Sequence, residues 1–386
     1  MRVLILTWRD AGHPEAGGSE TFVERVSDGL VSLGHEVTIF TAGYEGAARE
    51  QTRAGRTYVR RGGRYSVYAR AGAHLARSRR RYDVVLDVQN GVPFWTPLWT
   101  RTPVVDVVHH VHREQWPEVF GPVRARFGWW LESRVAPRVY SGKDYLTVSD
   151  ATRQELLTLG VPAERVNVVY SGNDLPVDTG EPAPPRTDHP SMVVLGRLVP
   201  HKRVELAIEA LARHRESHPA LTLTIVGHGY WEPELRAHAE ALGVADSVDF
   251  AGFVEEGSKH DLLARSWIQL LPSVKEGWGL VVLEAGFHRT PTVAFRSAGG
   301  TTESIVDRAT GLLADDDEDF LDGVGQLLDD AGLREELGRA ARDHAQKFSW
   351  EGTAKGVETV LASAAAARRG SAERGSAQPE VTASRT

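Results

Sequence analysis

Residues 274–284 read VKEGWGLVVLE, in which two glutamates bracket a glycine-rich turn and the apolar run after the turn predicts a buried helix. A helix N-terminus offers unpaired N–H groups and a positive dipole end to an anion, and Gly277 and Gly279 let the backbone approach phosphate oxygens closely. At about 1.5 Å of rise per residue, Glu284 lies roughly two turns beyond Glu276. The pattern predicts a site for a nucleotide-sugar diphosphate, in which one carboxylate holds the ribose and the other the transferred sugar.

The alternative interpretation is that Glu276 only caps the helix and Glu284 is solvated. Two features of the sequence argue against it. Glu284 lies between Leu283 and Ala285 in a stretch that is apolar all round, where a buried carboxylate without a ligand or partner is costly. Glu276 follows the apolar, strand-like run 268–271, which is where an α/β domain exposes its ligand-binding loops.

Composition places the chain among ordinary globular proteins. Of its residues 41% are hydrophobic and 25% are charged, and a length of 386 residues is sufficient for two domains. No cysteine is present, so disulfides and thiolate–metal sites are excluded. Residues 1–7 are strand-like and lack the features of a signal peptide, and no apolar span of 18 residues occurs. We therefore expect a cytoplasmic protein.

Charge is divided unevenly along the chain. Residues 1–175 carry 23 Lys+Arg against 19 Asp+Glu, and the remainder carries 22 against 33. A basic, partly aromatic surface predicts a peripheral contact with anionic lipid at the inner face of the membrane, and the alternative is a solvated arginine face beside core aromatics. No nucleic-acid recognition motif accompanies the charge, so we expect no nucleic-acid partner. The residues concerned are Arg53, Arg56, Arg60, Arg61, Arg64, Arg70, Arg77, Arg79, Arg80 and Arg81, with Arg124, Arg126, Phe127, Trp129, Trp130, Leu131, Arg134 and Arg138.

Alternating strand and helix patterns predict two doubly wound domains. The first covers residues 1–175, and a proline-rich segment at 176–190 is expected to be a linker. The second covers residues 191–347, after which a helix at about 348–362 crosses back to the first domain. The strands are expected at 2–7, 35–41, 83–88, 103–109, 143–149 and 166–170, and then at 191–195, 221–226, 248–250, 268–271 and 291–295.

Two further segments are expected to lack regular structure. Residues 363–386 are rich in Ala, Arg, Ser and Gly with little apolar bulk, which predicts a disordered tail. Residues 44–70 and 113–127 are expected to be variable loops of the first domain that select the acceptor.

Cations follow the first strand of the second domain. Arg197 comes directly after Gly196, and Lys202 lies five residues further on, just before a predicted helix. An arginine clamps phosphate in a fork and a lysine adds a compact charge, so the pair suits a diphosphate leaving group. Taken alone, this motif could also be an ordinary surface loop. The glutamate-bracketed turn is expected at the same edge of the sheet, which favours a shared binding site.

A glycine-rich run precedes the first predicted helix of the first domain. The run Gly17-Gly18-Ser19-Glu20 lies between a strand and its helix, where backbone N–H groups can meet an anion or sugar, or where Glu20 merely completes a capping box. The spacing Gly-x-Gly-x-x-Gly is absent there, which disfavours a nicotinamide or flavin enzyme.

The run His109-His110-Val111-His112 ends a predicted strand, so at least one imidazole is expected in the crevice above the sheet. Zinc is the less favoured alternative, because successive side chains of an extended segment point to opposite faces. The run 315–317 of three aspartates is interpreted as a helix N-cap and not as a metal site. We expect no bound metal.

Together these motifs resemble the retaining glycosyltransferases of family 4, also described as glycosyl transferases group 1, over nearly all of residues 1–360. The resemblance implies an α/β chain of the GT-B fold, with two facing doubly wound Rossmann-like domains and a cleft between them. It also implies a metal-independent hexosyltransferase that retains anomeric configuration by front-face displacement. The family's usual phenylalanine after Gly277 is Trp278 here.

The resemblance also implies a role for each residue. The donor's transferred sugar would contact Glu276 and either His109 or His110, since the strand end leaves the histidine uncertain by one residue. Glu284 would hold the ribose, and backbone at Phe253 and Val254 would face the base. The donor diphosphate would contact Arg197, Lys202, Gly277, Gly279, Leu280 and Gly18, and the acceptor side would comprise Gly17, Ser19 and Glu20.

Other functions of the same architecture stay open at this point. A nucleotide-sugar 2-epimerase would use the same diphosphate grip without an acceptor, and a non-catalytic protein would only bind the sugar nucleotide. The expected donor is a UDP- or GDP-hexose, and the expected acceptor a hydroxyl of a glycan, a lipid-linked saccharide or a small molecule. Sequence alone does not determine the base, the sugar, the regiochemistry or the oligomeric state.

Overall fold

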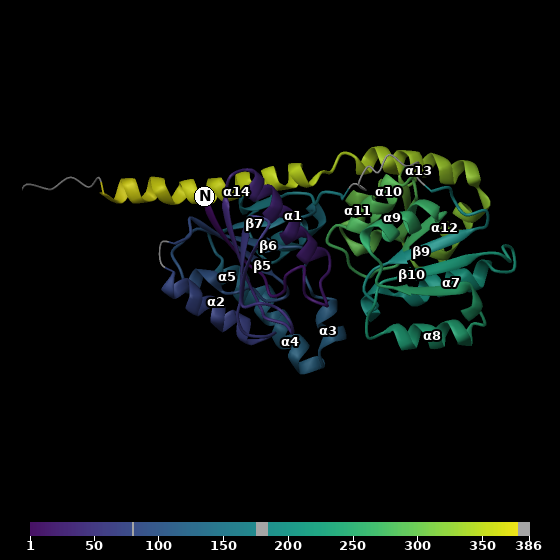
Figure 1. The fold of residues 1–386 in the computed structure, drawn as a ribbon, viewed down its shortest axis with the longest axis horizontal. Helices are drawn as coiled ribbons and strands as arrows, with labels where there is room; N and C mark the ends of the chain where they lie inside the picture. The colour runs from purple at the N-terminus through teal and green to yellow at the C-terminus, as the bar shows by residue number, and fades with distance from the viewer. Residues whose placement is uncertain (79–80, 175–183, 377–386) are drawn as a thin grey trace, which may run out of the picture.

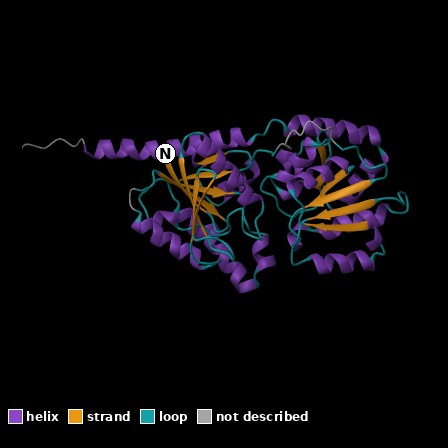
Figure 2. Cartoon of the chain, in the orientation of Figure 1, coloured by secondary structure: helices purple, strands orange, loops and turns teal. Residues whose placement is uncertain are grey.

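The chain forms two α/β domains, each built on its own sheet (Figures 1 and 2). The computed structural model describes residues 1–78, 81–174 and 184–376. Arg79, Arg80, most of the expected linker and residues 377–386 lie outside the described residues. Side chains alternate between two buried faces along each central strand, which is the pattern of a sheet covered on both sides.

The first sheet has eight strands, and all neighbouring pairs are parallel except the β3–β4 pair. Strand β1 (Arg2–Leu6) is central and aliphatic, and Val3 to Leu6 are fully buried. Its side chains therefore pack against apolar residues on both faces of the sheet, and this burial stabilises the domain. In spatial order the strands are β3 (Glu50–Arg53), β4 (Arg56–Arg60), β2 (Glu36–Thr41), β1, β5 (Val84–Gln89), β6 (Val104–Val108), β7 (Asp144–Thr147) and β8 (Val166–Val168).

Helices cover both faces of this sheet. Helix α6 begins where the sequence predicts, because the hydroxyl of Ser149 accepts a hydrogen bond from the N–H of Thr152. The helices are α1 (Gly18–Ser32), α2 (Ser66–Arg77), α3 (Gln115–Val119), α4 (Pro122–Trp130), α5 (Ala136–Val139) and α6 (Asp150–Thr158), and a π-helical turn at Leu131–Val135 joins α4 to α5.

The second sheet is entirely parallel, with six strands and one large apolar core. In spatial order its strands are β11 (Val248–Gly252), β10 (Thr222–Val226), β9 (Ser191–Leu195), β12 (Ile268–Leu271), β13 (Thr292–Phe295) and β14 (Gly311–Ala314). Its helices are α7 (Val204–His214), α8 (Glu232–Ala241), α9 (Glu256–Arg265), α10 (Leu280–Phe287), α11 (Thr301–Ser304), α12 (Asp317–Asp329) and α13 (Ala331–Ala345).

The prediction that residues 44–70 and 113–127 are loops was wrong. The first segment contains the β3–β4 hairpin, whose turn places Ala54 and Gly55 at positive φ, and the start of α2. The second contains α3 and most of α4. All four residues of β3 are exposed and polar, so this strand lacks the apolar alternation from which a strand is recognised.

Helix α14 (Trp350–Ser376) returns from the second domain to the first, lying along the top of Figure 1. Val357 and Leu361 pack with α1 in the core of the first domain, and Gly29 allows the helices to meet because a Cβ there would overlap Ala354. The crossing helix was predicted, but its end was placed too early. Residues 363–376, expected to be disordered, continue the helix.

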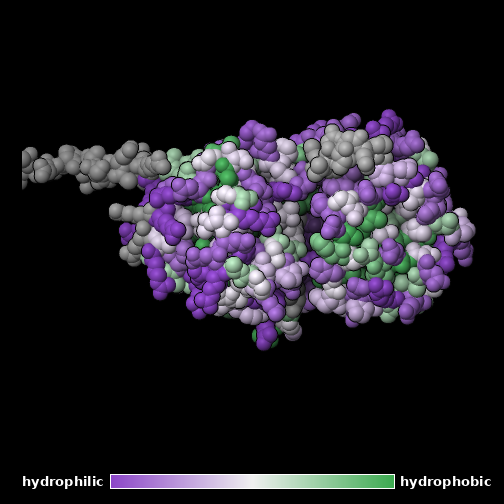
Figure 3. Space-filling view, in the orientation of Figure 1, coloured by the Kyte–Doolittle hydropathy of each residue, from purple (hydrophilic) through white to green (hydrophobic). Residues whose placement is uncertain are grey.

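Several contacts hold the two domains together. Glu303 of α11 accepts hydrogen bonds from the first two N–H groups of α6, at 2.8 and 2.9 Å. Trp278 and Leu283 of the second domain join the core cluster beneath the first sheet. These contacts bring the carboxyl ends of the two sheets face to face, where α/β domains bind ligands. In the space-filling view a furrow separates the domains (Figure 3).

Candidate active site

A cleft of about 1110 Å³ lies between the carboxyl ends of the two sheets. The structure brings together in this cleft every residue that the sequence analysis singles out for binding or catalysis. Loops after β1 and β6 supply one wall, and loops after β9, β11 and β12 supply the other. The residues are Gly17, Gly18, Ser19, Glu20, His109, His110, Arg197, Lys202, Phe253, Val254, Glu276, Gly277, Gly279, Leu280 and Glu284.

The glycine-rich turn forms the floor of the cleft at the start of α10. Gly279 is the N-cap and has a φ of 85°, a left-handed conformation that favours glycine. Gly277 faces the carbonyl oxygen of His109 so closely that an added Cβ would overlap it. The turn therefore allows the first domain to approach while the initial N–H groups of α10 remain available to an anion.

Glu276 and Lys202 form an ion pair within the cleft. The Lys202 Nζ and a Glu276 carboxylate oxygen are 2.6 Å apart, and both side chains are largely buried. Lys202 comes from the loop after β9 and Glu276 from the loop after β12. Neighbouring strands thus place a cation and a carboxylate at one point beside the N-terminus of α10.

Glu284 has a protein partner, which the sequence analysis did not anticipate. Lys259 of α9 lies 2.9 Å from the Glu284 carboxylate and also pairs with Glu256. Burial alone would lower the pKa of Lys259, but the two carboxylates raise it above its ordinary value. Lys259 thereby compensates the charge of the largely buried Glu284 carboxylate.

Two family models match the chain, one for each domain. The model described as Glycosyltransferase Family 4 matches residues 16–176, and the model described as Glycosyl transferases group 1 matches residues 181–344. Together they cover most of both sheets and most of both walls of the cleft, while β1 lies before the first match. The chain belongs to the family 4 glycosyltransferases. The predicted GT-B fold and family are confirmed.

Curated relatives of this glycosyltransferase carry several names. A D-inositol 3-phosphate glycosyltransferase of Kribbella flavida is 36% identical over 236 residues, which are 56% of this chain and 55% of the relative. A glycogen synthase of Mycobacterium tuberculosis is 30% identical over 66% of this chain and 62% of its own length. The chain thus spans little more than half the length of the first of these proteins.

An uncharacterized glycosyltransferase of Methanocaldococcus jannaschii, MJ1607, is matched over 93% of this chain and 97% of its own length, at 26% identity. Among solved structures, sucrose-phosphate synthase from Thermosynechococcus elongatus has a TM-score of 0.78 at 18% identity, over 95% of this chain and 99% of its own. The Anabaena protein Alr3699/HepE, solved in complex with UDP and glucose, has a TM-score of 0.73 at 20% identity, over 94% and 100%. At these identities the likeness to the solved structures supports the fold alone.

In this glycosyltransferase the two strand-end histidines differ in their surroundings. Burial lowers the pKa of His109 to about 4, so the ring is neutral at pH 7. Its buried Nε2 has no hydrogen-bond partner within the part of the chain that the structure describes. His110 instead bonds to the Gln115 side chain at 3.2 Å. The His109 Nε2 is therefore a ring nitrogen that a ligand could engage, while the Nε2 of His110 is engaged by Gln115.

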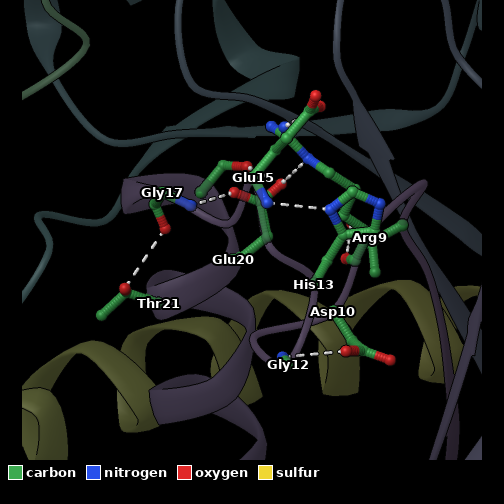
Figure 4. A network of polar contacts seen from close by, with 10 residues as sticks. Arg9, Asp10, Gly12, His13, Glu15, Gly17, Glu20 and Thr21 are labelled. Carbon is green, nitrogen blue, oxygen red and sulfur yellow. Dashed lines mark hydrogen bonds and ion pairs between the residues drawn. The ribbon is translucent and has the colours of Figure 1, made fainter. Parts of the chain in front are cut away.

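The loop before α1 is held by a buried network (Figure 4). One carboxylate oxygen of Glu20 accepts the N–H of Gly17 at 2.7 Å, and the other accepts Arg9 Nε and Ser19 Oγ, both at 3.1 Å. Glu20 is 1% exposed. These contacts let Glu20 position Gly17 and Arg9, and its expected place on the acceptor side stays a prediction.

The remaining predicted residues lie at the cleft rim. Arg197 is exposed and lies beside Gly17 of the opposite domain. Phe253 is 78% exposed, and the neighbouring Val254 packs partly into the second domain. The aspartate run is a helix cap, as predicted, because Asp316 accepts the N–H of Asp319. Within residues 1–78, 81–174 and 184–376, no three His, Asp or Glu side chains are grouped to hold a metal ion.

Sequence reasoning missed Lys259, Asn90 and the pair Trp8 and Arg9, all of which line the cleft. One signal was available for the lysine. The chain has only six lysines among its 45 basic residues, and three of them (Lys202, Lys259 and Lys275) form ion pairs with carboxylates in or beside the cleft. No local pattern distinguishes the other three residues.

Buried histidines predict that acid destabilises the fold. Burial lowers the pKa values of His109, His201 and His288 to about 4, below the usual value near 6.5. Between these values the unfolded chain binds more protons than the folded chain. Stability is therefore fully present above pH 6.5 and declines as the pH falls toward 4, by on the order of 1 kcal/mol per unit of pKa shift.

Urea unfolding at a series of pH values measures this decline. His288 lies outside the cleft, so His288→Gln is expected to flatten part of the pH dependence without altering the site. A free energy of unfolding that stays constant between pH 7 and pH 5 would contradict the assignment of these three histidines as neutral in the fold.

Proposed function

We propose that the chain is a retaining hexosyltransferase that uses a UDP- or GDP-hexose and glycosylates a hydroxyl of a glycan, a lipid-linked saccharide or a small molecule. The observation that carries the proposal is the convergence of Arg197, Lys202 and the start of α10 between the carboxylates Glu276 and Glu284. Two cations and a helix N-terminus suit a diphosphate, and the flanking carboxylates suit hydroxyls of the sugar and ribose. The curated relatives that are named as glycosyltransferases support a transfer reaction.

Catalysis would depend on stabilising the leaving group. As the bond between the sugar C1 and the diphosphate oxygen breaks, negative charge grows on the diphosphate beside Arg197, Lys202 and the amides that open α10. The acceptor oxygen bonds to C1 on the same face, and its proton passes to the departing diphosphate oxygen. Neutral His109 would offer a hydrogen bond to the donor sugar. Since protein cations neutralise the charge, the reaction is proposed to need no metal.

In this structure Lys202 and Glu276 pair with each other. Donor binding would separate them, so that Lys202 turns to the diphosphate and Glu276 accepts sugar hydroxyls. Glu284 would exchange part of its contact with Lys259 for the ribose, which leaves the buried lysine compensated by Glu256. The site thus keeps its charges paired in both states, which limits the desolvation cost of holding them in a closed cleft.

The donor assignment predicts stabilisation by a nucleotide sugar. A ligand at 100 times its dissociation constant stabilises the fold by about 2.7 kcal/mol, which a thermal-shift panel of UDP-, GDP- and ADP-hexoses detects. With the donor so identified, NMR of the glycoside product is expected to show retained configuration, and EDTA to leave the rate unchanged.

Absence of stabilisation by every nucleotide sugar would refute the donor site. Inverted product would refute the front-face mechanism, and EDTA inhibition reversed by added metal would refute metal independence. Formation of an epimeric donor without acceptor would identify an epimerase instead.

We also propose that α4 contacts an anionic membrane surface. Val123 is 80% exposed and Trp130 is 51% exposed, and Phe127 stacks on Trp130 with ring centroids 5.8 Å apart. Arg124 and Arg126 on the same short helix are exposed, which suits anionic lipid. Within the described residues no helix is long and apolar enough to cross a bilayer.

Vesicle co-sedimentation tests this contact. Because each buried apolar side chain contributes about 1.5–3 kcal/mol, replacing both Val123 and Trp130 by serine is expected to lower binding to phosphatidylglycerol vesicles at least roughly tenfold. Leu242→Ser removes an exposed apolar residue of the second domain and is the matched control. Equal binding by the double variant and the wild type would contradict the proposal.

A further inference from the structure

A row of polar side chains lies behind the proposed ribose site, where α9 packs against α10 (Figure 1). Glu256, Lys259 and His260 follow one another at helical spacing along one face of α9. Glu284 and the C-capping residue His288 are four residues apart on the facing side of α10. Each helix thus carries a polar stripe, and the packing of the two helices joins the stripes into one row.

Two contacts cross from α9 to α10. Lys259 Nζ lies 2.9 Å from the Glu284 carboxylate, and His260 Nδ1 lies 2.8 Å from His288 Nε2. Within α9, Glu256 forms an ion pair with Lys259 and also lies 3.6 Å from His260 Nε2. Glu256, Lys259 and Glu284 line the cleft, whereas His260 lies behind them and is 6% exposed. His260 therefore reaches the cleft only through Glu256 and Lys259.

The hydrogens of this row are assigned from the chemistry of its members. A carboxylate only accepts, so His260 Nε2 carries its hydrogen toward Glu256. In the neutral ring the opposite nitrogen, Nδ1, then accepts from His288 Nε2–H. Burial lowers the pKa of His288 to about 4, so that ring is neutral at pH 7. The His260 ring is the main cause that lowers the pKa of Glu256 to about 2, so this carboxylate is ionised.

The two ends of the row differ in how firmly they are held. The backbone N–H of His288 donates to Ala285 at 2.9 Å, and its carbonyl oxygen accepts Arg186 at 3.2 Å. Glu256, by contrast, is the first residue of α9 and is 59% exposed. An exposed ion pair restrains a long side chain only weakly. The contact with buried His260 is therefore what keeps the Glu256 carboxylate beside Lys259.

The position of Glu256 decides how strongly Lys259 pairs with Glu284. The Lys259 side chain is 16% exposed, and a largely buried ammonium needs a carboxylate partner. With Glu256 in place, two carboxylates share this ammonium, and Glu284 keeps capacity to accept ribose hydroxyls. With Glu256 turned to solvent, Lys259 would pair with Glu284 alone and would compete with the ribose.

We propose that His260 is a positioning residue for the donor's ribose: it holds Glu256 against Lys259 and thereby frees part of the Glu284 carboxylate for the ribose hydroxyls. This inference rests on the proposed function, in which Glu284 binds the ribose. Because the effect is on recognition of the donor, loss of this contact is expected to raise the KM for the donor several-fold and to leave kcat nearly unchanged.

Calorimetry with UDP and GDP, each compared with its 2′,3′-dideoxy counterpart, measures the ribose contact in the full chain. The wild type is expected to bind the ribonucleotide roughly tenfold or more tightly than the dideoxynucleotide. His260→Asn keeps a polar group at the Nδ1 position toward His288 but none toward Glu256, and is expected to lower that ratio at least about threefold. His260→Gln keeps an N–H at the Nε2 position toward Glu256 and is expected to retain the ratio.

Glu256→Gln is a second variant that does not depend on a buried position. It is expected to lower the ratio as His260→Asn does, and to leave the affinity for the dideoxynucleotide unchanged. Glu255→Gln is the matched control, because Glu255 is exposed, precedes α9 directly and lies outside the lining of the cleft. Melting temperatures of all four variants report folding separately.

The outcomes separate this inference from the donor site. A wild type that binds neither nucleotide, or that binds the ribo and dideoxy forms equally, would refute the ribose role of Glu284 and this inference with it. A wild-type ratio in His260→Asn would overturn the inference alone, as would an equal loss of ratio in His260→Gln. An equal loss of affinity for both forms of the nucleotide would show general damage to the site and would likewise overturn it.

Discussion

Lys202→Ala is expected to lower kcat by roughly 10²–10³-fold, the usual effect of removing one preorganised group that stabilises a developing anion. Lys202 pairs with Glu276 at 2.6 Å, beside the N-terminus of α10. In the proposed reaction its charge acts mainly as the diphosphate departs, so kcat is expected to fall more than donor affinity. Single-turnover transfer and calorimetry with the donor measure the two effects separately.

Loss of folding is not expected to explain this result. The melting temperature of the variant separates an effect on turnover from one on folding, because a change of about 1 kcal/mol shifts the melting temperature of a domain this size by only about 2–4 °C. Lys355→Ala is the matched control, because Lys355 forms an exposed pair with Glu351 on α14. Glu276→Ala is expected to reduce turnover strongly as well. Near-normal transfer by both folded site variants would contradict their roles.

Gly277→Ala is expected to lower kcat/KM by about 10²-fold or more. A Cβ at this position would overlap the carbonyl oxygen of His109, so the two walls of the cleft could not approach as they do in this structure. Misplacement of reacting groups by about 1 Å costs a factor of this size. Because Arg197, Lys202 and Glu284 belong to the second domain alone, UDP affinity is expected to fall far less than turnover.

Gly257→Ala controls for the substitution itself. Gly257 is exposed on α9, and a Cβ there meets no atom within 4 Å, so this variant is expected to behave as wild type or to be slightly more stable. Small-angle scattering of Gly277→Ala is expected to show a more open molecule. Wild-type kcat/KM in Gly277→Ala would show that close approach at His109 is not required.

Most of the fold was predictable because its signals are local. Aliphatic runs such as residues 2–6 mark buried parallel strands, and Ser149 marks a helix start, without knowledge of any distant partner. Prediction failed where the local signal was missing, as in β3, whose four residues are exposed and polar. It also failed for residues 363–376, where a helix continues although the composition is typical of a tail.

The sequence by itself determined most of the two sheets. It also placed Arg197, Lys202 and Glu276 in segments that follow strands and Glu284 on the next helix, because strand patterns and turn chemistry are local signals. Only the tertiary structure decided which charges meet. Lys202 and Glu276 are 74 residues apart, and Lys259 and Glu284 are 25 apart. Pairing over such separations depends on how neighbouring strands and helices pack, and no local pattern encodes it. The same reason explains why Arg64 and Trp8, far apart in the chain, are found to be neighbours only in the folded molecule.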